Sequence, residues 1–259
     1  MNSYLMGIKQ NIFAIHQLTM RDKKHENSAT FMGELWEILN PAIIMLVMVL
    51  VFSEMLGTDT IKNYPVFVLT GLTMFNLFSN GTIACLEALV DNKNLLIMSQ
   101  LNRRVYVVQR VALVLRNFLF SLFVYAFVLA LFEYSPQSLW LVIIIDIILL
   151  TVLILGIGKI LAVANVYFAD TTYFWRIFTV FVFYGSALFF SVERLPQAIQ
   201  DLMIINPIYD AIHIAREMIM SNYIVEARYW IALAVYAAVF YIIGTYVFNK
   251  YSDDVVAKI

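Results

Sequence analysis

The sequence contains no motif of the kinds that bind nucleotide phosphates or a catalytic metal ion. The pattern GxxxxGK[ST] is absent, and the nearest stretch, GIGK at residues 156–159, has the wrong spacing and lies in an apolar run. HExxH and CxxC are absent, and the three histidines (His16, His25 and His213) are scattered. We therefore expect no catalytic residues, no metal site and no cofactor held by this chain, so energy must come from elsewhere.

Cysteine and charge are both scarce. The single cysteine, Cys85, cannot form an internal disulfide and cannot build a metal site by itself. Charged residues make up only 14% of the 259 residues, whereas 62% are hydrophobic. Water cannot be the main solvent of a domain with this composition.

Long hydrophobic runs are what the sequence has in abundance. A hydrocarbon core of about 30 Å needs about 20 helical residues. Six runs qualify, at residues 38–56, 65–90, 105–132, 139–163, 172–190 and 229–248. We predict an all-α polytopic membrane protein, with one transmembrane domain over residues 1–259 and short connectors.

Basic residues predict the orientation, because Lys and Arg are retained in cytoplasmic loops. Most of them fall before the first span, between spans two and three, and at the tail. These are Lys9, Arg21, Lys23, Lys24, Lys93, Arg103, Arg104, Lys250 and Lys258. We expect both termini in the cytoplasm.

Two segments outside the spans have helical patterns. Over residues 5–20, apolar residues recur every three or four positions, which predicts an amphipathic helix in the membrane interface. Over residues 195–220, two short helices are expected, at 196–205 and 207–220, with Asn206 as N-cap and Pro207 in the first turn. This hairpin either re-enters the membrane or lies flat on its outer surface.

The connection between spans two and three, residues 91–104, predicts a short helix with one apolar side and polar ends. It either seats in a groove of a cytoplasmic partner or is an ordinary interfacial loop. Its candidate contact residues are Asp91, Asn92, Lys93, Asn94, Leu95, Leu96, Met98, Leu101, Arg103 and Arg104.

Several runs, in order, resemble a known family. They are FMGELWEILNP at 31–41, YPVF and LTGL at 64–72, NLL to RR at 94–104, FAD at 168–170, and NP with ARE at 206–217. Together they resemble permease subunits of ABC transporters that export polysaccharides. The capsule exporters of Gram-negative bacteria look most similar, with O-antigen and teichoic acid exporters close behind.

That resemblance implies a function and a set of partners. We expect a bacterial inner-membrane homodimer, bound to two ATP-binding subunits that hold ATP and Mg²⁺, which exports a lipid-linked capsular polysaccharide. Further implied partners are a periplasmic co-polymerase, an outer-membrane export protein and membrane lipids, but no nucleic acid. On the family pattern, residues 5–20 and 91–104 face the ATPase. The hairpin, with Asn206, Pro207, Arg216 and Glu217, closes the outer end.

Ionisable residues inside spans are functional candidates, because insertion costs roughly 2.5–3.5 kcal/mol each. Arg110 and Arg116 are candidates for receiving a phosphate-bearing lipid headgroup, the alternative being anchoring and helix packing. Contact between Arg116 and Asp146 is not expected. At about 1.5 Å per helical residue, Arg116 lies roughly 25 Å below Glu133, whereas Asp146 lies only about 12 Å below Ser138. Lys159 and Glu87 are interpreted as anchors that snorkel to the interface.

Aromatic residues at span ends are typical of interfacial belts. Phe174, Phe178 and Phe181 share one face of span five and run towards Tyr184. This stripe either lines a conduit for a glycan or faces lipid and neighbouring helices. Two other classes of function remain open: a membrane-embedded lipid-modifying enzyme, and a permease for drugs or small lipids.

Overall fold

The computed structural model describes residues 2–28, 39, 42–44, 46–47, 63–98, 101–134 and 137–258, and these residues form helices without any strand. The α-helices are α1 (Asn2–Ser28), α3 (Tyr64–Asp91), α4 (Lys93–Met98), α5 (Arg104–Leu131), α6 (Ile143–Tyr167), α7 (Thr171–Gly185), α8 (Gln197–Met203), α9 (Pro207–Arg216) and α10 (Ala227–Lys258). Short 3-10 turns lie at η1 (Ser138–Leu141) and η2 (Val192–Arg194), and a π-helical turn, η3 (Glu217–Ser221), follows α9.

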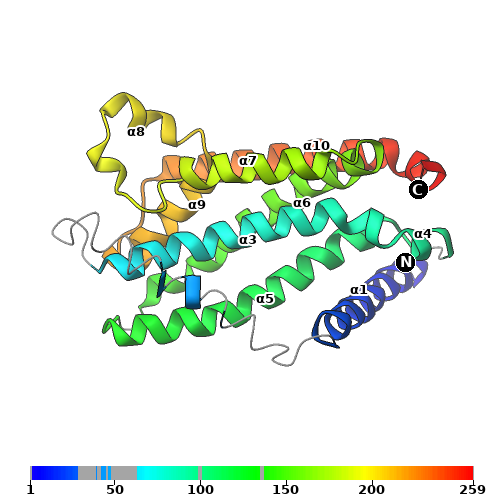
Figure 1. Cartoon of the computed structure of the whole chain (residues 1–259), viewed down its shortest axis with the longest axis horizontal. Helices are drawn as coiled ribbons and strands as arrows, with labels where there is room; N and C mark the ends of the chain where they lie inside the picture. Colours follow the sequence, from blue (N-terminus) through cyan, green and yellow to red (C-terminus); the bar gives the residue numbers. More distant parts are fainter. Residues whose placement is uncertain are drawn as a thin grey trace.

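Helix α3 lies in the middle of the bundle (Figure 1), where it packs against α5, α6, α7 and α9. Helix α10 packs along α6, and α1 packs against α5. Both termini lie at the same end as α4, whereas α8 and α9 lie at the opposite end. We call these the α4 end and the α9 end.

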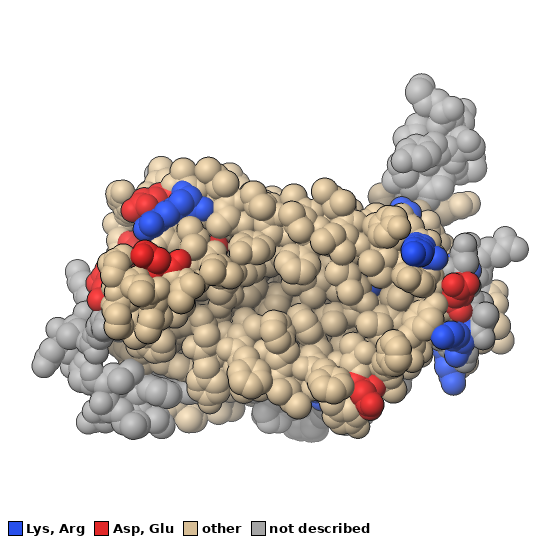
Figure 2. All heavy atoms as spheres, turned by 90° about the horizontal axis from the view of Figure 1, so that it is seen from above, with Lys and Arg blue, Asp and Glu red and all other residues tan. Residues whose placement is uncertain are grey.

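Four of the predicted spans are confirmed. Among the described residues, Tyr64–Asp91, Arg104–Leu131, Leu139–Tyr167 and Ala227–Ser252 are long and apolar enough to cross a membrane. On the face seen in Figure 2, Lys, Arg, Asp and Glu gather towards the two ends and leave the middle uncharged. Such a band is what a hydrocarbon core requires of a spanning protein. The predicted first span, 38–56, lies largely outside the described residues.

The predicted fifth span, 172–190, is too long. Helix α7 has 15 residues and ends at Gly185, so it measures about 22 Å, short of a hydrocarbon core of about 30 Å. Two side chains pair with backbone carbonyls at this end of α7. Asn206 Nδ2, from the start of α9, donates to the Gly185 carbonyl (3.1 Å), and the neighbouring Ser186 hydroxyl donates to the Val182 carbonyl (2.6 Å). Ala187 then takes a positive φ of 49° and turns the chain away.

Two glycines allow α6 and α10 to approach closely. A Cβ on Gly156 would lie 2.5 Å from the backbone of Phe240 and Tyr241, and one on Gly244 would overlap the Gly156 carbonyl oxygen. Small residues at such contacts let helix backbones touch in membranes, where packing drives association. The α6–α10 contact therefore depends on the absence of side chains at both positions.

Two helices that were predicted outside the spans have different boundaries in the structure. The amphipathic helix predicted over 5–20 is the longer α1, and its described side chains include Leu18, packed against the core, and Ile12 and Phe13, which are exposed. The segment predicted over 91–104 contains only the six-residue helix α4, because α3 continues to Asp91 and α5 begins at Arg104.

The two hairpin helices differ in burial. Asn206 caps α9 by accepting a hydrogen bond from the Ile208 amide (3.0 Å), and Pro207 follows it, as predicted. Helix α9 is largely buried against α3, α6 and α10, whereas no residue of α8 is buried. Re-entry into the membrane stays a prediction, and only α9 has the burial that it requires.

Candidate functional site

Three helices meet at the α4 end through charged and amide side chains, which we call the clasp. Its members are Arg21, Asp22, Asp91, Asn92, Gln109 and Arg110. Arg21 of α1 donates to Asn92 Oδ1 (2.8 Å). Gln109 of α5 donates to Asp22 Oδ2 (3.0 Å). Arg110 lies 2.8 Å from the Asp91 carboxylate and 3.7 Å from that of Asp22. The clasp therefore ties α1 to the end of α3 and to α5.

The clasp includes Arg110, one of the two arginines predicted to contact a lipid headgroup. Arg110 already faces two carboxylates, so an incoming phosphate would have to share this guanidinium with them. Arg116 lies 5.6 Å from the ring centroid of Phe120, and Lys23 of α1 lies 5.2 Å from the same ring. The headgroup role stays a prediction for both arginines.

We predict that Asp22→Ala loosens α1, because it removes the acceptor of the Gln109 hydrogen bond (3.0 Å) and the carboxylate that faces Arg110 (3.7 Å). Hydrogen bonds to charged groups contribute about 1.5–3 kcal/mol, so amide hydrogen exchange in α1 should become about tenfold faster or more, while exchange in α6 stays unchanged. The matched control is Glu87→Ala, which removes an exposed ion pair with Arg176 (3.1 Å) and should change little. Unchanged exchange in α1 of Asp22→Ala would show that the clasp does not hold this helix.

The predicted partner-facing segment presents two exposed apolar side chains. In α4, Leu96 is buried, whereas Ile97 is 61% and Met98 is 86% exposed. Lys93 and Asn94 are exposed beside them, Leu95 packs against the core, and Leu101 and Arg103 are partly exposed. Arg104 donates to Asn249 Oδ1 of α10 (2.6 Å). The segment thus exposes the apolar side chains of Ile97 and Met98, while Arg104 bonds it to α10 and Asn92 bonds it to α1.

The aromatic stripe lies on the exposed side of α7. Phe174, Phe178, Phe181 and Tyr184 are 50–73% exposed, whereas Trp175 and Phe183 face the bundle. The Trp175 indole donates to Thr82 (3.0 Å), and the Phe183 ring packs edge-on against Phe75 (5.0 Å). Helix α7 therefore has two aromatic faces. The inward face packs against α3, and the outward face is exposed to a second chain, to lipid or to substrate.

Arg216 organises the α9 end. Its guanidinium donates to the carbonyls of Phe67 (3.1 Å), Ala187 (2.9 Å) and Leu188 (2.8 Å) and stacks 3.5 Å from the Phe67 ring centroid. It is 6% exposed. Gly71 makes room for it, because a Cβ there would lie 2.6 Å from Arg216 Nη2. Arg216 therefore joins α9 to α3 and to the turn after α7.

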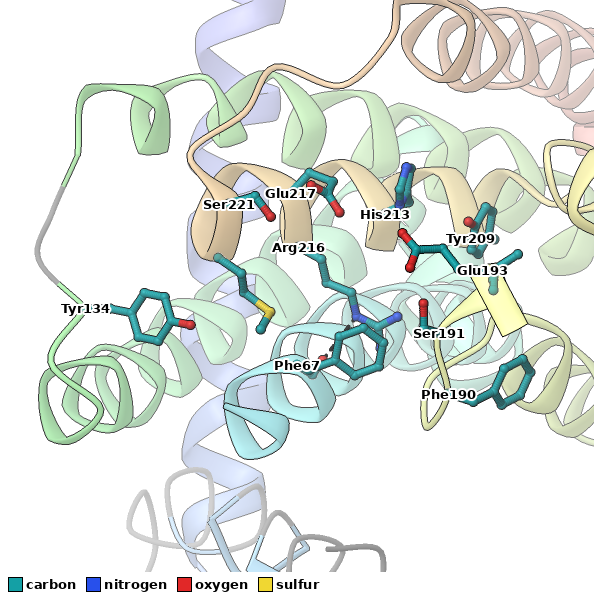
Figure 3. A pocket seen from close by; sticks show the side chains of 12 residues that line it. Phe67, Tyr134, Phe190, Ser191, Glu193, Tyr209, His213, Arg216, Glu217 and Ser221 are labelled. Atoms are coloured by element: carbon teal, nitrogen blue, oxygen red, sulfur yellow. Dashed lines mark hydrogen bonds between the residues drawn. The ribbon is translucent and has the colours of Figure 1, made fainter. Parts of the chain in front are cut away.

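A cavity of about 280 Å³ lies beside Arg216 at the α9 end (Figure 3). Its polar lining comes from Tyr134, Ser191, Glu193, Tyr209, His213, Glu217 and Ser221, and its apolar lining from Phe67, Phe190, Val192 and Met220. In Figure 3, Glu193, Tyr209 and His213 lie on one side of the cavity and Tyr134 on the other. Burial lowers the pKa of His213, so its imidazole is neutral at pH 7.

Other buried charged groups differ in how they are satisfied. Lys159 is 4% exposed and donates to Thr245 of α10 (2.9 Å), so its interpretation as a snorkelling anchor is wrong. Asp146 and Asp210 are fully buried, and their oxygens have no hydrogen-bond partner within the described part of the chain. Burial raises the pKa of Asp210 to about 8, so it holds a proton at neutral pH.

The sequence pattern singled out Arg216 but could not show its contacts. It did not single out Asp22 and Gln109 of the clasp, or Phe190 and Glu193 of the cavity. Asp22 is separated from Gln109 by 87 positions, so no local pattern could have joined them. One signal was available: an acidic residue between Arg21 and Lys23 on a helix otherwise rich in basic residues.

Comparison with known proteins covers most of the chain. Residues 14–220 match the family model described as ABC-2 type transporter. The chain is 24% identical over 237 residues to the O-antigen export system permease protein RfbA of Klebsiella pneumoniae, covering 90% of each. It is 25% identical over 242 residues to RfbA of Myxococcus xanthus, covering 92% of each. With the polysialic acid transport protein KpsM of Escherichia coli it shares 24% over 247 residues, 92% of this chain and 93% of the relative. The predicted resemblance is thereby confirmed, and the chain belongs to the ABC-2 type transporter family.

Proposed function

We propose that this chain is the permease subunit of an ATP-driven exporter of a lipid-linked cell-surface polysaccharide. The observation that carries the proposal is the similarity, along about nine-tenths of each chain, to permeases named for O-antigen export and for polysialic acid transport. The family is one of transporters, which favours transport over the alternative of a lipid-modifying enzyme. Capsular polysaccharide and O-antigen are both represented among these relatives, so the glycan is defined here by its class.

The α4 end supports coupling to an ATPase. Ile97 and Met98 form an exposed apolar tip between two spans, at the end where both termini lie (Figure 1). An amphipathic helix laid into an apolar groove is a common recognition mode. A partner that moves α4 also moves α1 and α10, because Asn92 bonds to Arg21 and Arg104 bonds to Asn249. We propose that the α4 end faces the cytoplasm of a bacterial inner membrane.

The assembly we propose has two copies of this chain and two ATP-binding subunits, which hold ATP and Mg²⁺. The exposed face of α7, with Phe174 and Phe181, supports the conduit, since it offers aromatic surface that the chain itself does not cover. Arg110 and Arg116 are the proposed contacts for a phosphate-bearing headgroup. The periplasmic and outer-membrane partners expected for polysaccharide export complete the proposal.

Affinity purification of the chain from its native membrane tests the proposal. A subunit with a phosphate-binding loop should co-purify in a one-to-one ratio. The double variant Ile97→Asp with Met98→Asp should recover at least about tenfold less of it, because charges would enter an apolar contact. Leu202→Asp is the matched control, since Leu202 is 59% exposed on α8 at the other end and should leave recovery unchanged.

Deletion of the gene tests the substrate class. Surface polysaccharide should disappear while its lipid-linked form accumulates inside the cell. Loss of capsule with intact lipopolysaccharide would identify the capsular glycan, and the reverse would identify O-antigen. A chain that purifies alone, in cells whose surface glycans are intact after deletion, would refute the proposal.

A further inference from the structure

The cavity at the α9 end combines aromatic surface with two carboxylates. Glu193 and Glu217 both line it, and neither forms an ion pair or a side-chain hydrogen bond with another described residue. Phe190, partly exposed, adds an aromatic surface to the same lining, and Tyr134 lies across the cavity from Glu193 (Figure 3). Hydroxyl groups of a ligand can donate to such carboxylates in charge-assisted hydrogen bonds.

Arg216 lines the cavity, but the protein itself already uses much of its guanidinium. Its Nε, Nη1 and Nη2 atoms all donate to backbone carbonyls, and its flat face stacks on Phe67. The His213 imidazole carries no charge at neutral pH, because burial lowers its pKa. The groups left to meet a ligand are therefore two carboxylates, hydroxyls of serine and tyrosine, and a neutral imidazole. Glu193 and Glu217 carry two negative charges against the single positive charge of Arg216, so the balance of charge disfavours an anionic ligand.

The size of the cavity also limits its ligand. Its volume, about 280 Å³, lies just below the roughly 300–1,000 Å³ of common small-molecule sites. A single ring fits such a space better than a stretch of polymer. Aromatic side chains offer a broad apolar surface, which suits the C–H face of a sugar while its hydroxyls reach the carboxylates.

We propose that this cavity binds one uncharged sugar unit at the outer end of the permease. The inference rests on the proposed function and deepens it, because it assigns a saccharide site to the exit and a preference for neutral over acidic sugars. The site lies between η2, α9 and the outer end of α3. A bound sugar would therefore contact the elements that Arg216 joins.

Saccharide binding to the full chain in lipid nanodiscs tests the site, since maltoside detergents carry sugars that would compete. Two single-ring probes are compared by saturation-transfer NMR: methyl β-D-glucopyranoside, which is neutral, and methyl β-D-glucuronide, which carries a carboxylate on the same ring. We expect saturable binding of the glucopyranoside and at least about tenfold weaker binding of the glucuronide. Glu193→Gln should weaken glucopyranoside binding about tenfold, because it removes a charged acceptor. Phe190→Leu should weaken it about threefold or more.

Matched controls lie outside the cavity. Glu133→Gln changes an exposed carboxylate, and Phe127→Leu changes an exposed aromatic ring on α5. Both should bind methyl β-D-glucopyranoside like the unmodified chain. Equal binding of the two probes, unchanged binding by Glu193→Gln and Phe190→Leu, or no saturable binding would each overturn the site.

Failure of the site and failure of the proposed function give different results. A chain that recovers its ATPase and supports surface polysaccharide, but binds no saccharide here, overturns the site alone. A chain without an ATPase partner and without an effect on surface glycans overturns the proposed function, whatever it binds in this cavity.

Discussion

Gly156→Val is expected to abolish stable packing of α6 against α10. Even a Cβ at this position would lie 2.5 Å from the backbone of Phe240 and Tyr241, and backbone atoms cannot rotate away as a side chain can. Overpacking a tight contact costs about 1–3 kcal/mol and occasionally more. We expect the larger loss here, because valine adds three carbons. The purified chain should unfold at least about 5 °C lower, followed by tryptophan fluorescence.

A series of glycine variants separates crowding from other effects. Gly156→Ala should lower the unfolding temperature less than Gly156→Val, and Gly244→Ala should do so as well, since its Cβ would overlap the Gly156 carbonyl. Gly185→Ala is the control, because nothing lies within 4 Å of a Cβ at that position. If Gly156→Ala and Gly185→Ala were equally stable, the close approach of α6 and α10 would not exist.

Arg216→Met is the second change with a large expected effect. Methionine keeps the apolar stem of the side chain but removes the guanidinium, and with it the stacking on Phe67 and all three hydrogen bonds to backbone carbonyls. The bonds to Ala187 and Leu188 are buried, and each buried carbonyl left unpaired costs about 1–3 kcal/mol. The loss should therefore be about 3 kcal/mol or more, measured as a lower unfolding temperature and a low yield of folded chain.

Other substitutions distinguish the geometry of Arg216 from its charge. Arg216→Lys keeps the charge but not the planar fork, so it should restore only part of the stability. Gly71→Ala should also be destabilising, because its Cβ would displace the guanidinium. Arg228→Met should change little, since Arg228 is an exposed partner of Glu226. Full stability of Arg216→Met would contradict the role assigned to these hydrogen bonds.

Local patterns predicted the elements whose formation depends on neighbours in sequence. Four spans were located within a few residues, because apolar length alone decides whether a helix can cross a membrane. The cap at Asn206 and the first-turn Pro207 were placed correctly for the same reason, since a cap bonds to an amide two residues away.

The errors occurred where distant side chains decide the outcome. Apolar residues continue past Gly185 to Phe190, so the pattern predicted a longer helix than α7. Asn206 and Arg216 instead bond to the carbonyls of Gly185, Ala187 and Leu188, and these bonds stabilise the turn. Lys159 was misplaced likewise, because its partner Thr245 lies 86 positions away.

The sequence by itself determined that this protein spans a membrane, where four of its helices lie, and that it resembles the polysaccharide-export permeases. These properties follow from apolar length and from short runs of residues, which need no knowledge of packing. Only the tertiary structure decided that Arg110 belongs to a clasp, that Arg216 bonds to Phe67 across 149 positions, and that Glu193 and Phe190 border a cavity. The physical reason is that hydrogen bonds and cavities depend on the distances between helices, and packing sets these distances.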